Sequence, residues 1–413
     1  MIKKIIIFIV VLTLLFYCAA CKVSAPSIDP SISQQTTTTS PSTTPPQPTT
    51  EANFDTELIK FLEENYEFST KNYVFSPLSY KYALLLATYG ANGTTQEELY
   101  KAMGYENLDD LLDWGKSVNT YVKEFETDAQ KALNFNGKQT RKLTIANSVW
   151  HNKDEKGTIK KTYSTYLEEN FNSETHNIPQ EDLVSSINNW ANEKTNGLIP
   201  KIVEEPLETN TVLANSLYLK SPWLNVQHKL ETPLPFNGIS ETKDINFLVS
   251  EARYRFYEDD DCTLVIVPLQ GGLQCVYVMG NTENLSTKIN NAQHTPIKLY
   301  TPEFTIETSL NNSELVDFLK NKNVTLAFDR EHSDFSNLID DAQIHISDIV
   351  QKAKIITNED GIEASAVTTI TMDTNESIEP EYESLFLDKP FKFFIYGNET
   401  EILLFCGNYC DPQ

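Results

Sequence analysis

Residues 72–79 of the chain read Asn-Tyr-Val-Phe-Ser-Pro-Leu-Ser. This run predicts a strand that ends at the Ser-Pro pair. The apolar-rich residues 80–89 then predict a helix, and the stretch Gly90–Thr95 predicts its end and the capped start of another helix. A strand followed directly by two helices is an arrangement of mixed α and β structure.

Further blocks of the same kind follow along the chain. Each one alone is ordinary packing in an α+β protein, but their order and their spread over about residues 55–412 are hard to attribute to chance. Together with residues 72–79 they resemble the serpin family of protease inhibitors. The blocks are Leu143–Ser148, Ile187–Trp190 with Lys194–Ile199, Leu213–Lys220 with Trp223, Pro302–Phe304, Asp334–Ser336, Lys389–Phe391, and Leu403–Gly407 with Pro412.

The resemblance implies an α+β serpin fold, with helices packed around three β-sheets and an exposed, metastable reactive-centre loop. It implies a monomer that uses no cofactor. The partner implied is a target protease of the serine class, with the cysteine class as an open alternative.

The segment between Glu359 and Pro390 has the pattern that carries this function. Long loops in compact domains are uncommon and usually functional. Every second residue here is small or apolar, and the residues between them are mostly polar, which is typical of a half-buried strand. The small or apolar set is Ile362, Ala364, Ala366, Thr368, Ile370 and Met372. From the pattern alone, the segment is either a permanent strand or a loop that becomes one.

The resemblance favours the second reading, because serpin loops enter the main sheet after cleavage and trap the protease covalently. It implies that residues 359–372 begin exposed. Ile362 stands where the family usually has threonine or another small residue. The hinge positions implied are Glu359, Gly361, Ile362, Glu363, Ala364, Ser365, Ala366, Val367 and Thr368.

The bond that the protease cuts is predicted from the family's spacing. Counting forward from Glu359 places it between Asn375 and Glu376, whereas counting backward from Pro390 points to Glu379. The run that begins at Ser377 supports Glu376–Ser377 as a second choice. No basic residue lies in residues 373–383, which disfavours a trypsin-like target.

The resemblance also implies a set of residues that hold the central strands closed. Gln351 occupies a position where histidine is common, and its amide can still donate and accept hydrogen bonds to Asn215 and Ser79. Glutamine does not titrate near neutral pH, so no pH sensitivity is expected there. The full set is Ser76, Ser79, Asn215, Trp223 and Gln351.

The N-terminal part predicts export. Residues 1–21 have a basic start, an apolar run and small residues before Cys21, as in a cleaved signal peptide, with an uncleaved anchor as the alternative. The pattern resembles a lipobox, which would lipidate Cys21 and tether a secreted protein to the cell surface, although Cys18 departs from that motif. Residues 22–51 are rich in Thr, Ser and Pro and predict a disordered stalk. The folded domain is expected over 52–413.

Other function classes find little support. The chain has six histidines, none of them in an HExxH motif, and it contains no GxSxG elbow or Gly-rich phosphate loop, so we expect neither an enzyme nor a metal site. The net charge of −25 argues against nucleic-acid binding. The remaining alternative is a non-inhibitory serpin that acts as a carrier or storage protein, but the apolar inward positions of the hinge favour inhibition.

Four cysteines belong to the predicted domain: Cys262, Cys275, Cys406 and Cys410. Apolar runs at 262–268 and 273–279 flank a Gln-Gly-Gly turn and predict a β-hairpin. Cys262 and Cys275 either form a disulfide across this hairpin or remain buried thiols.

Overall fold

The computed structural model describes residues 54–136, 141–203, 211–310, 312–340, 343–347, 349–362, 381–397 and 402–412. The predicted export signal 1–21 with Cys21 and the predicted stalk 22–51 lie outside these residues. None of the helices in the described part is long and apolar enough to cross a membrane.

Helix α2 (Pro77–Gly90) follows strand β1 (Tyr73–Phe75) directly. The Ser76 side chain accepts a hydrogen bond from the backbone N–H of Ser79 at 3.0 Å, which caps the first turn of α2. The helix is buried nearly all round and forms the centre of the core. The predicted order of a strand and two helices is confirmed. The other helices are α1 (Phe54–Asn65), α3 (Gly93–Ala102), α4 (Leu108–Asn136), α5 (Lys161–Phe171), α6 (Gln180–Lys194), α7 (Leu285–Asn291) and α8 (Asn312–Asn321).

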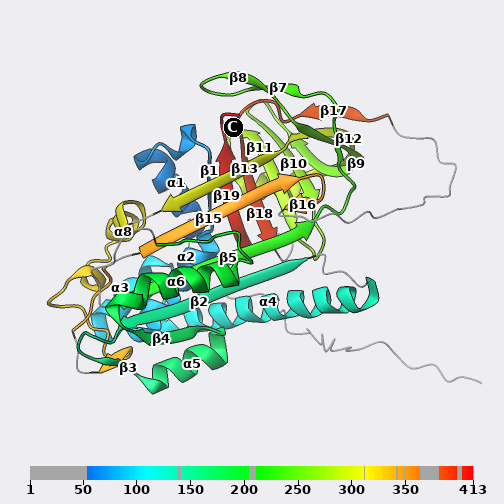
Figure 1. The fold of residues 1–413 in the computed structure, drawn as a ribbon. Helices are drawn as coiled ribbons and strands as arrows, with labels where there is room; N and C mark the ends of the chain where they lie inside the picture. Colours follow the sequence, from blue (N-terminus) through cyan, green and yellow to red (C-terminus); the bar gives the residue numbers. More distant parts are fainter. Residues whose placement is uncertain are drawn as a thin grey trace, which may run out of the picture. The chain divides into compact units, whose positions relative to one another are not determined.

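A six-stranded sheet crosses the molecule in the order β13-β15-β16-β5-β2-β4. Helix α6 lies over one face of this sheet (Figure 1), where Trp150, Ile187 and Trp190 belong to a small apolar cluster. The side chains of the other face join the main core. The strands are β2 (Lys142–Asn152), β4 (Glu174–Ile178), β5 (Thr211–Pro222), β13 (Phe304–Leu310), β15 (Ile349–Asn358) and β16 (Gly361–Ile362).

A nine-stranded sheet has the order β1-β19-β18-β11-β10-β9-β12-β17, and β6 pairs with β9. The predicted α+β class is confirmed, with two short ladders, β3 with β14 and β7 with β8, beside these sheets. The remaining strands are β3 (Thr158–Ile159), β6 (His228–Lys229), β7 (Leu234–Asn237), β8 (Thr242–Ile245), β9 (Phe247–Glu258), β10 (Cys262–Pro268), β11 (Gln274–Gly280), β12 (Gln293–Pro302), β14 (Ile339–Asp340), β17 (Glu383–Phe386), β18 (Phe391–Gly397) and β19 (Ile402–Tyr409).

The predicted hairpin is confirmed as β10 and β11, which pair antiparallel. The alternative of a disulfide across this hairpin is wrong. In the described part of the chain Cys262, Cys275, Cys406 and Cys410 are all free and buried. Cys262 lies opposite Gly280 and Cys275 lies opposite Val267, so the two thiols are far apart along the ladder. Burial raises the pKa of the Cys275 thiol to about 12.

Candidate functional site: the hinge and the central sheet

The hinge begins at a tight turn between β15 and β16. β15 ends at Asn358, Glu359 and Asp360 form the turn, and the chain reverses at Gly361. The N–H of Asp360 donates to the Asn358 side chain at 3.0 Å, which holds the turn in place. β16 is therefore a strand that lies antiparallel beside the strand that precedes it.

β16 is inserted between β15 and β5. Ile362 pairs with Thr357 on one side and with Ser221 on the other. The Ile362 side chain is 2 % exposed and belongs to the main core. Burial of an isoleucine side chain contributes roughly 1.5–3 kcal/mol, so this single residue anchors the strand.

Gly361 is required by the close approach of β5. Its φ of +144° is a conformation that side chains of L-residues rarely adopt. A Cβ atom on residue 361 would lie 2.3 Å from the carbonyl oxygen of Ser221 and 2.6 Å from the Cα of Pro222. Only glycine fits at this point without a shift of β5.

One expectation about the hinge is wrong in part. The resemblance implies that residues 359–372 begin outside the sheet, but Gly361 and Ile362 already pair with both neighbouring strands in the uncut chain. The physical reason is that burying the large apolar side chain of Ile362 in the core stabilises the strand more than burying a small side chain would. The other hinge positions, Glu363, Ala364, Ser365, Ala366, Val367 and Thr368, and the candidate cleavage residues Asn375, Glu376 and Ser377 lie outside the described residues.

Trp223 tethers the turn from the end of β5. Its indole Nε1 donates to the carbonyl oxygen of Asn358 at 2.8 Å, and the ring is 7 % exposed. Ser221 adds a second contact on this side, because its hydroxyl donates to the carbonyl of Gln270 at 2.8 Å. The upper end of the central sheet is thus closed by β16 and by the Trp223 hydrogen bond, while Ser221 ties β5 to the β10–β11 turn.

At the lower end the two central strands meet directly. Ile349 and Val350 of β15 pair in parallel with Leu213 and Ala214 of β5. The described residues of β15 and β5 are therefore joined at two levels, through β16 at the top and by direct pairing at the base.

Gln351 joins β15 to the start of α2. Its Nε2 donates to the carbonyl oxygen of Ser76 at 2.8 Å, and its Oε1 accepts from the Ser76 N–H at 3.1 Å. These contacts replace the expected ones to Asn215 and Ser79. Among the described residues, the Ser79 hydroxyl and Asn215 Oδ1 have no hydrogen-bond partner.

Asn215 makes a different contact from the one expected. Its Nδ2 donates to Oδ1 of Asn147, which lies directly opposite it in the β2–β5 ladder. Sequence reasoning did not identify Asn147 as part of this region. The signal available was its place in the block Leu143–Ser148, which has the same Ala-Asn-Ser run as Leu213–Lys220.

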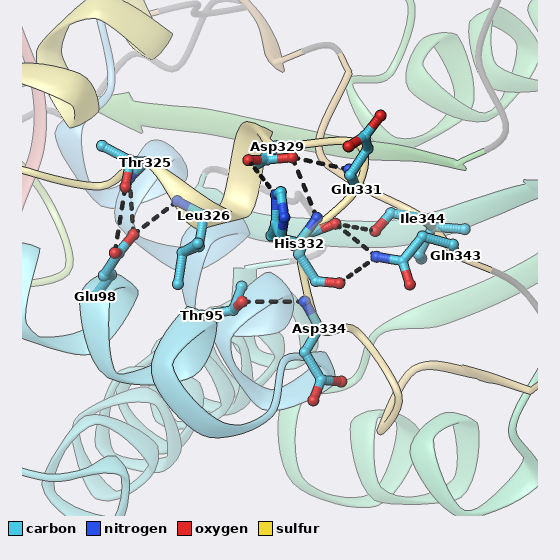
Figure 2. A network of polar contacts seen from close by, with 11 residues as sticks. Thr95, Glu98, Thr325, Leu326, Asp329, Glu331, His332, Asp334, Gln343 and Ile344 are labelled. Carbon is cyan, nitrogen blue, oxygen red and sulfur yellow. Dashed lines mark hydrogen bonds and ion pairs between the residues drawn. The ribbon is translucent and has the colours of Figure 1, made fainter.

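The segment that leads into β15 is fastened to α3 by a polar network (Figure 2). The Glu98 carboxylate accepts the N–H groups of Thr325 and Leu326 at 2.7 and 2.8 Å. The Thr95 hydroxyl accepts the N–H of Asp334 at 3.0 Å. Asp329 accepts the backbone N–H of Glu331, and this hydrogen bond lowers the pKa of the Asp329 carboxyl. Residues 325–334 are therefore held against α3 by side-chain contacts to main-chain N–H groups.

Residues 49–412 match the family model described as serpin (serine protease inhibitor). The chain belongs to the serpin family. Among relatives, Iripin-2 of Ixodes ricinus is 28 % identical over 354 residues, which are 79 % of this chain and 84 % of that protein. Human Serpin B8 is 29 % identical over 362 residues, covering 80 % of this chain and 90 % of its own length.

Solved serpin structures share the fold. The thermophilic serpin tengpin in its native state aligns with a TM-score of 0.72 at 25 % identity, covering 87 % of this chain and 92 % of tengpin. Thyroxine-binding globulin in complex with thyroxine aligns with a TM-score of 0.71 at 21 % identity, covering 88 % of this chain and 98 % of that protein. Serpins are mostly protease inhibitors rather than enzymes, although the family includes such binding proteins.

Most serpins are extracellular, although some act inside cells. Within the described ranges of this serpin, no group of three or more His, Cys, Asp or Glu side chains is placed to hold a metal ion.

Proposed function

We propose that this serpin is a suicide-substrate inhibitor: a protease cuts its reactive-centre loop, the loop enters the six-stranded sheet, and the acylated protease is trapped. The observation that carries the proposal is the position of β16. Ile362 lies between Thr357 and Ser221, so the first step of insertion is present in the uncut chain and sets the register for the residues that follow.

Continuing this register gives each inward loop position a defined pair of neighbours. A two-residue advance from Ile362 brings Ala364 between Ile355 and Leu219, which are both 3 % exposed. The next advance brings Ala366 between Ala353 and Leu217. Small side chains suit these positions, because the neighbouring strands already fill the core with large ones.

The following step reaches the residues that hold the strands together. In the same register, Thr368 comes between Gln351 and Asn215, and its hydroxyl could satisfy the unpartnered Oδ1 of Asn215. Ile370 then comes between Ile349 and Leu213, which now pair with each other. Insertion beyond Thr368 therefore requires that the direct pairing of β15 with β5 be broken.

The energy available exceeds this cost. A strand of about a dozen residues makes on the order of ten main-chain hydrogen bonds, each worth roughly 1 kcal/mol net. Breaking the lower pairing removes the bonds of two residue pairs, and a shift of β15 also breaks the two hydrogen bonds between Gln351 and Ser76. The surplus is available to move the attached protease and distort its active site, and the inhibitor supplies no catalytic group.

We propose Asn375–Glu376 as the bond that is cut, with Glu376–Ser377 second, and a serine or cysteine protease without trypsin-like preference as the target. Mixing the chain with proteases of elastase-like, chymotrypsin-like, glutamyl and asparaginyl preference tests this. A band that resists denaturing electrophoresis supports trapping, and the mass of the released C-terminal fragment identifies the bond. Clean cleavage by all of them, without such a band and without a gain in heat stability, would instead indicate a non-inhibitory serpin.

We also propose that the protein is an exported monomer. Its signal peptide is cleaved so that Cys21 becomes the first residue of the mature chain, and Cys21 carries a lipid directly before the stalk 22–51. The intact mass of the protein from its own membrane fraction tests this. The proposal requires an N-terminal Cys21 that carries the mass of a diacylglyceryl group. A mature chain that begins elsewhere or has no added mass contradicts lipidation.

A further inference from the structure

Exposed apolar side chains gather on one face of the nine-stranded sheet. Among the residues that the structure describes, the large hydrophobic side chains that stand exposed are Leu224 (62 %), Ile239 (52 %), Val226 (46 %) and Phe386 (40 %). Leu224 and Val226 belong to the segment between β5 and β6, and Phe386 ends β17. Ile239 lies elsewhere, at the tip of the β7–β8 hairpin. Single exposed apolar residues are ordinary, whereas a group of them marks an interaction surface.

The register of the strands places these side chains on the same face. Val249 of β9 pairs with His228 of β6 on one side and with Tyr300 of β12 on the other. Tyr300 in turn pairs with Phe386 of β17, and their two rings stack with centroids 4.1 Å apart. Residues that pair directly across strands point to the same face of a sheet. The four side chains therefore form one row, and the strands β9, β12 and β17 that carry three of them lie side by side in Figure 1.

A hollow of about 460 Å³ opens at the β6 end of this row. Its apolar lining comes from Leu224, Val226 and Val249, and the ion pair of Lys298 with Glu251, at 2.7 Å, lines its polar side. The N–H of Leu224 donates to the last carbonyl oxygen of β10 at 2.9 Å, so the exposed segment is fixed in place. A surface that is fixed before its partner arrives loses little conformational entropy on binding. The hollow is thus prepared to receive a large apolar side chain.

The reactive-centre loop indicates which partner meets this face, because the loop runs into β17. The proposed cleavage residue Glu376 precedes the start of β17 at Glu383 by about seven residues, which span at most roughly 25 Å. A protease domain of about 230 residues has a radius of gyration of roughly 17 Å, so its diameter exceeds that span. A protease bound at the proposed bond therefore extends over β17 and its neighbours.

We propose that Leu224, Val226 and Phe386 belong to a second recognition surface for the target protease, outside the reactive-centre loop. The hollow receives a large apolar side chain from a surface loop of the protease. Arg253 is exposed two residues along β9 from Glu251 and so lies on the same face, where it favours a carboxylate beside that side chain. This inference rests on the proposed function, because it names what the inhibitor recognises besides the bond that is cut.

The test uses the full chain and the protease that the chain traps among those tested above. The probe is that protease with its catalytic nucleophile replaced by alanine, so that binding is measured without cleavage. Leu224→Ser combined with Val226→Ser should weaken binding by about tenfold, as expected for apolar residues that anchor an interface. Ile239→Ser is the matched control, because it removes an equally exposed apolar side chain outside this surface, and it should bind as the wild type does.

A second readout separates docking from the chemistry of the loop. With the active protease, the double variant should form the covalent complex about tenfold more slowly, in step with its weaker binding. The number of inhibitor molecules consumed per trapped protease should stay unchanged, because the surface acts before the bond is cut. A purely structural effect on the loop would change that number. Phe386→Ala, at the other end of the surface, takes the place of the double variant if that variant does not fold.

Equal binding by the double variant and the wild type would overturn the proposal, and so would an equal loss in Ile239→Ser. The failure of the proposed function looks different, because then no protease is trapped at all and the surface loses its partner with it. Trapping by the wild type together with unchanged binding by the double variant refutes the surface alone.

Discussion

Gln351 and Ser76 exchange two hydrogen bonds, from Nε2 to the carbonyl oxygen at 2.8 Å and from the N–H to Oε1 at 3.1 Å. The glutamine is 5 % exposed and Ser76 is 1 % exposed, so water cannot replace either bond. This pair joins the middle of β15 to the helix that forms the centre of the core. Any opening of the sheet that shifts β15 has to break it.

The first prediction concerns this pair. Gln351→Leu leaves the buried N–H of Ser76 unpaired, while the Ser76 carbonyl oxygen still accepts the N–H of Tyr80 at 3.2 Å, so the free energy of unfolding should fall by roughly 1–3 kcal/mol. Urea unfolding measures the loss. Gln351→His is the matched variant, because its imidazole titrates near neutrality and should introduce a pH dependence between about pH 5 and 8 that the wild type lacks. A flat response in Gln351→His would contradict this role for the position.

Gly361→Ala is expected to expel β16. The alanine Cβ meets the main chain of Ser221 at 2.3 Å in a conformation with φ of +144°, and such strained positions cost about 1–3 kcal/mol before the clash is counted. Faster hydrogen exchange at Ile362 and a lower melting temperature should follow. Gly272→Ala is the control, since its φ is +75° but nothing lies within 4 Å of the added atom. If both variants lose the same stability, the close approach of β5 is not what selects glycine.

The charge of Glu363 should affect the stability of the cut chain more than that of the uncut chain. Lys142 and Lys220 stand directly opposite each other in the β2–β5 ladder. In the proposed register Glu363, the residue after Ile362, comes beside Lys220. A cross-strand ion pair is worth roughly 0.2–1 kcal/mol and like charges cost a similar amount. Glu363→Lys should therefore lower the melting temperature of the cut chain more than that of the uncut chain, with Glu363→Gln between. Equal shifts in the two forms would argue against this register.

The buried Lys81, beside Asp55, predicts a contribution to stability that grows at alkaline pH. Lys81 is 4 % exposed, with its Nζ 4.4 Å from the ring centre of Trp114 and 4.9 Å from that of Tyr105. Burial lowers the pKa of Lys81 to about 8, and the charge of Asp55 opposes that effect. Burial also raises the pKa of Asp55.

Between pH 8 and the ordinary lysine pKa of 10.5, the unfolded chain binds a proton at Lys81 that the folded chain does not. At Lys81 this difference makes stability increase with pH through this window, by on the order of a few kcal/mol. The buried thiols act in the opposite direction above the ordinary cysteine pKa of 9.0, because burial raises their pKa values and the folded chain keeps protons that the unfolded chain releases.

Urea unfolding of the wild type and of the double variant Asp55→Asn with Lys81→Met at pH 7, 8 and 9.5 isolates Lys81, because the thiols contribute equally to both. The difference in the free energy of unfolding between the two should shift in favour of the wild type from pH 7 to 9.5. A difference that stays constant would contradict the titration of Lys81.

Several features follow from local sequence alone. Ser76 and Pro77 predict where α2 begins because capping is decided within one turn, and the Gln270–Gly272 turn predicts the β10–β11 hairpin for the same reason. The alternation of residues in the hinge predicts that the Ile362 side chain faces the core, and the structure places it there.

The remainder depends on contacts between distant residues. Whether Ile362 lies inside the sheet is decided by the space between Thr357 and Ser221, which no local pattern reveals. The partner of Gln351 is one of several groups near it, and a resemblance cannot choose Ser76 over Ser79. The absence of a Cys262–Cys275 bond reflects the register of a ladder rather than the presence of two thiols.

The most direct measurement is the melting temperature of the full-length chain before and after a single cut between Met372 and Pro390. We predict a large rise, because the freed loop adds a strand between β15 and β5 in the register set by Ile362, and we predict that Gly361→Ala reduces the rise. An unchanged or lower melting temperature in the cut wild-type chain would contradict the claim that this sheet is built to accept its own loop.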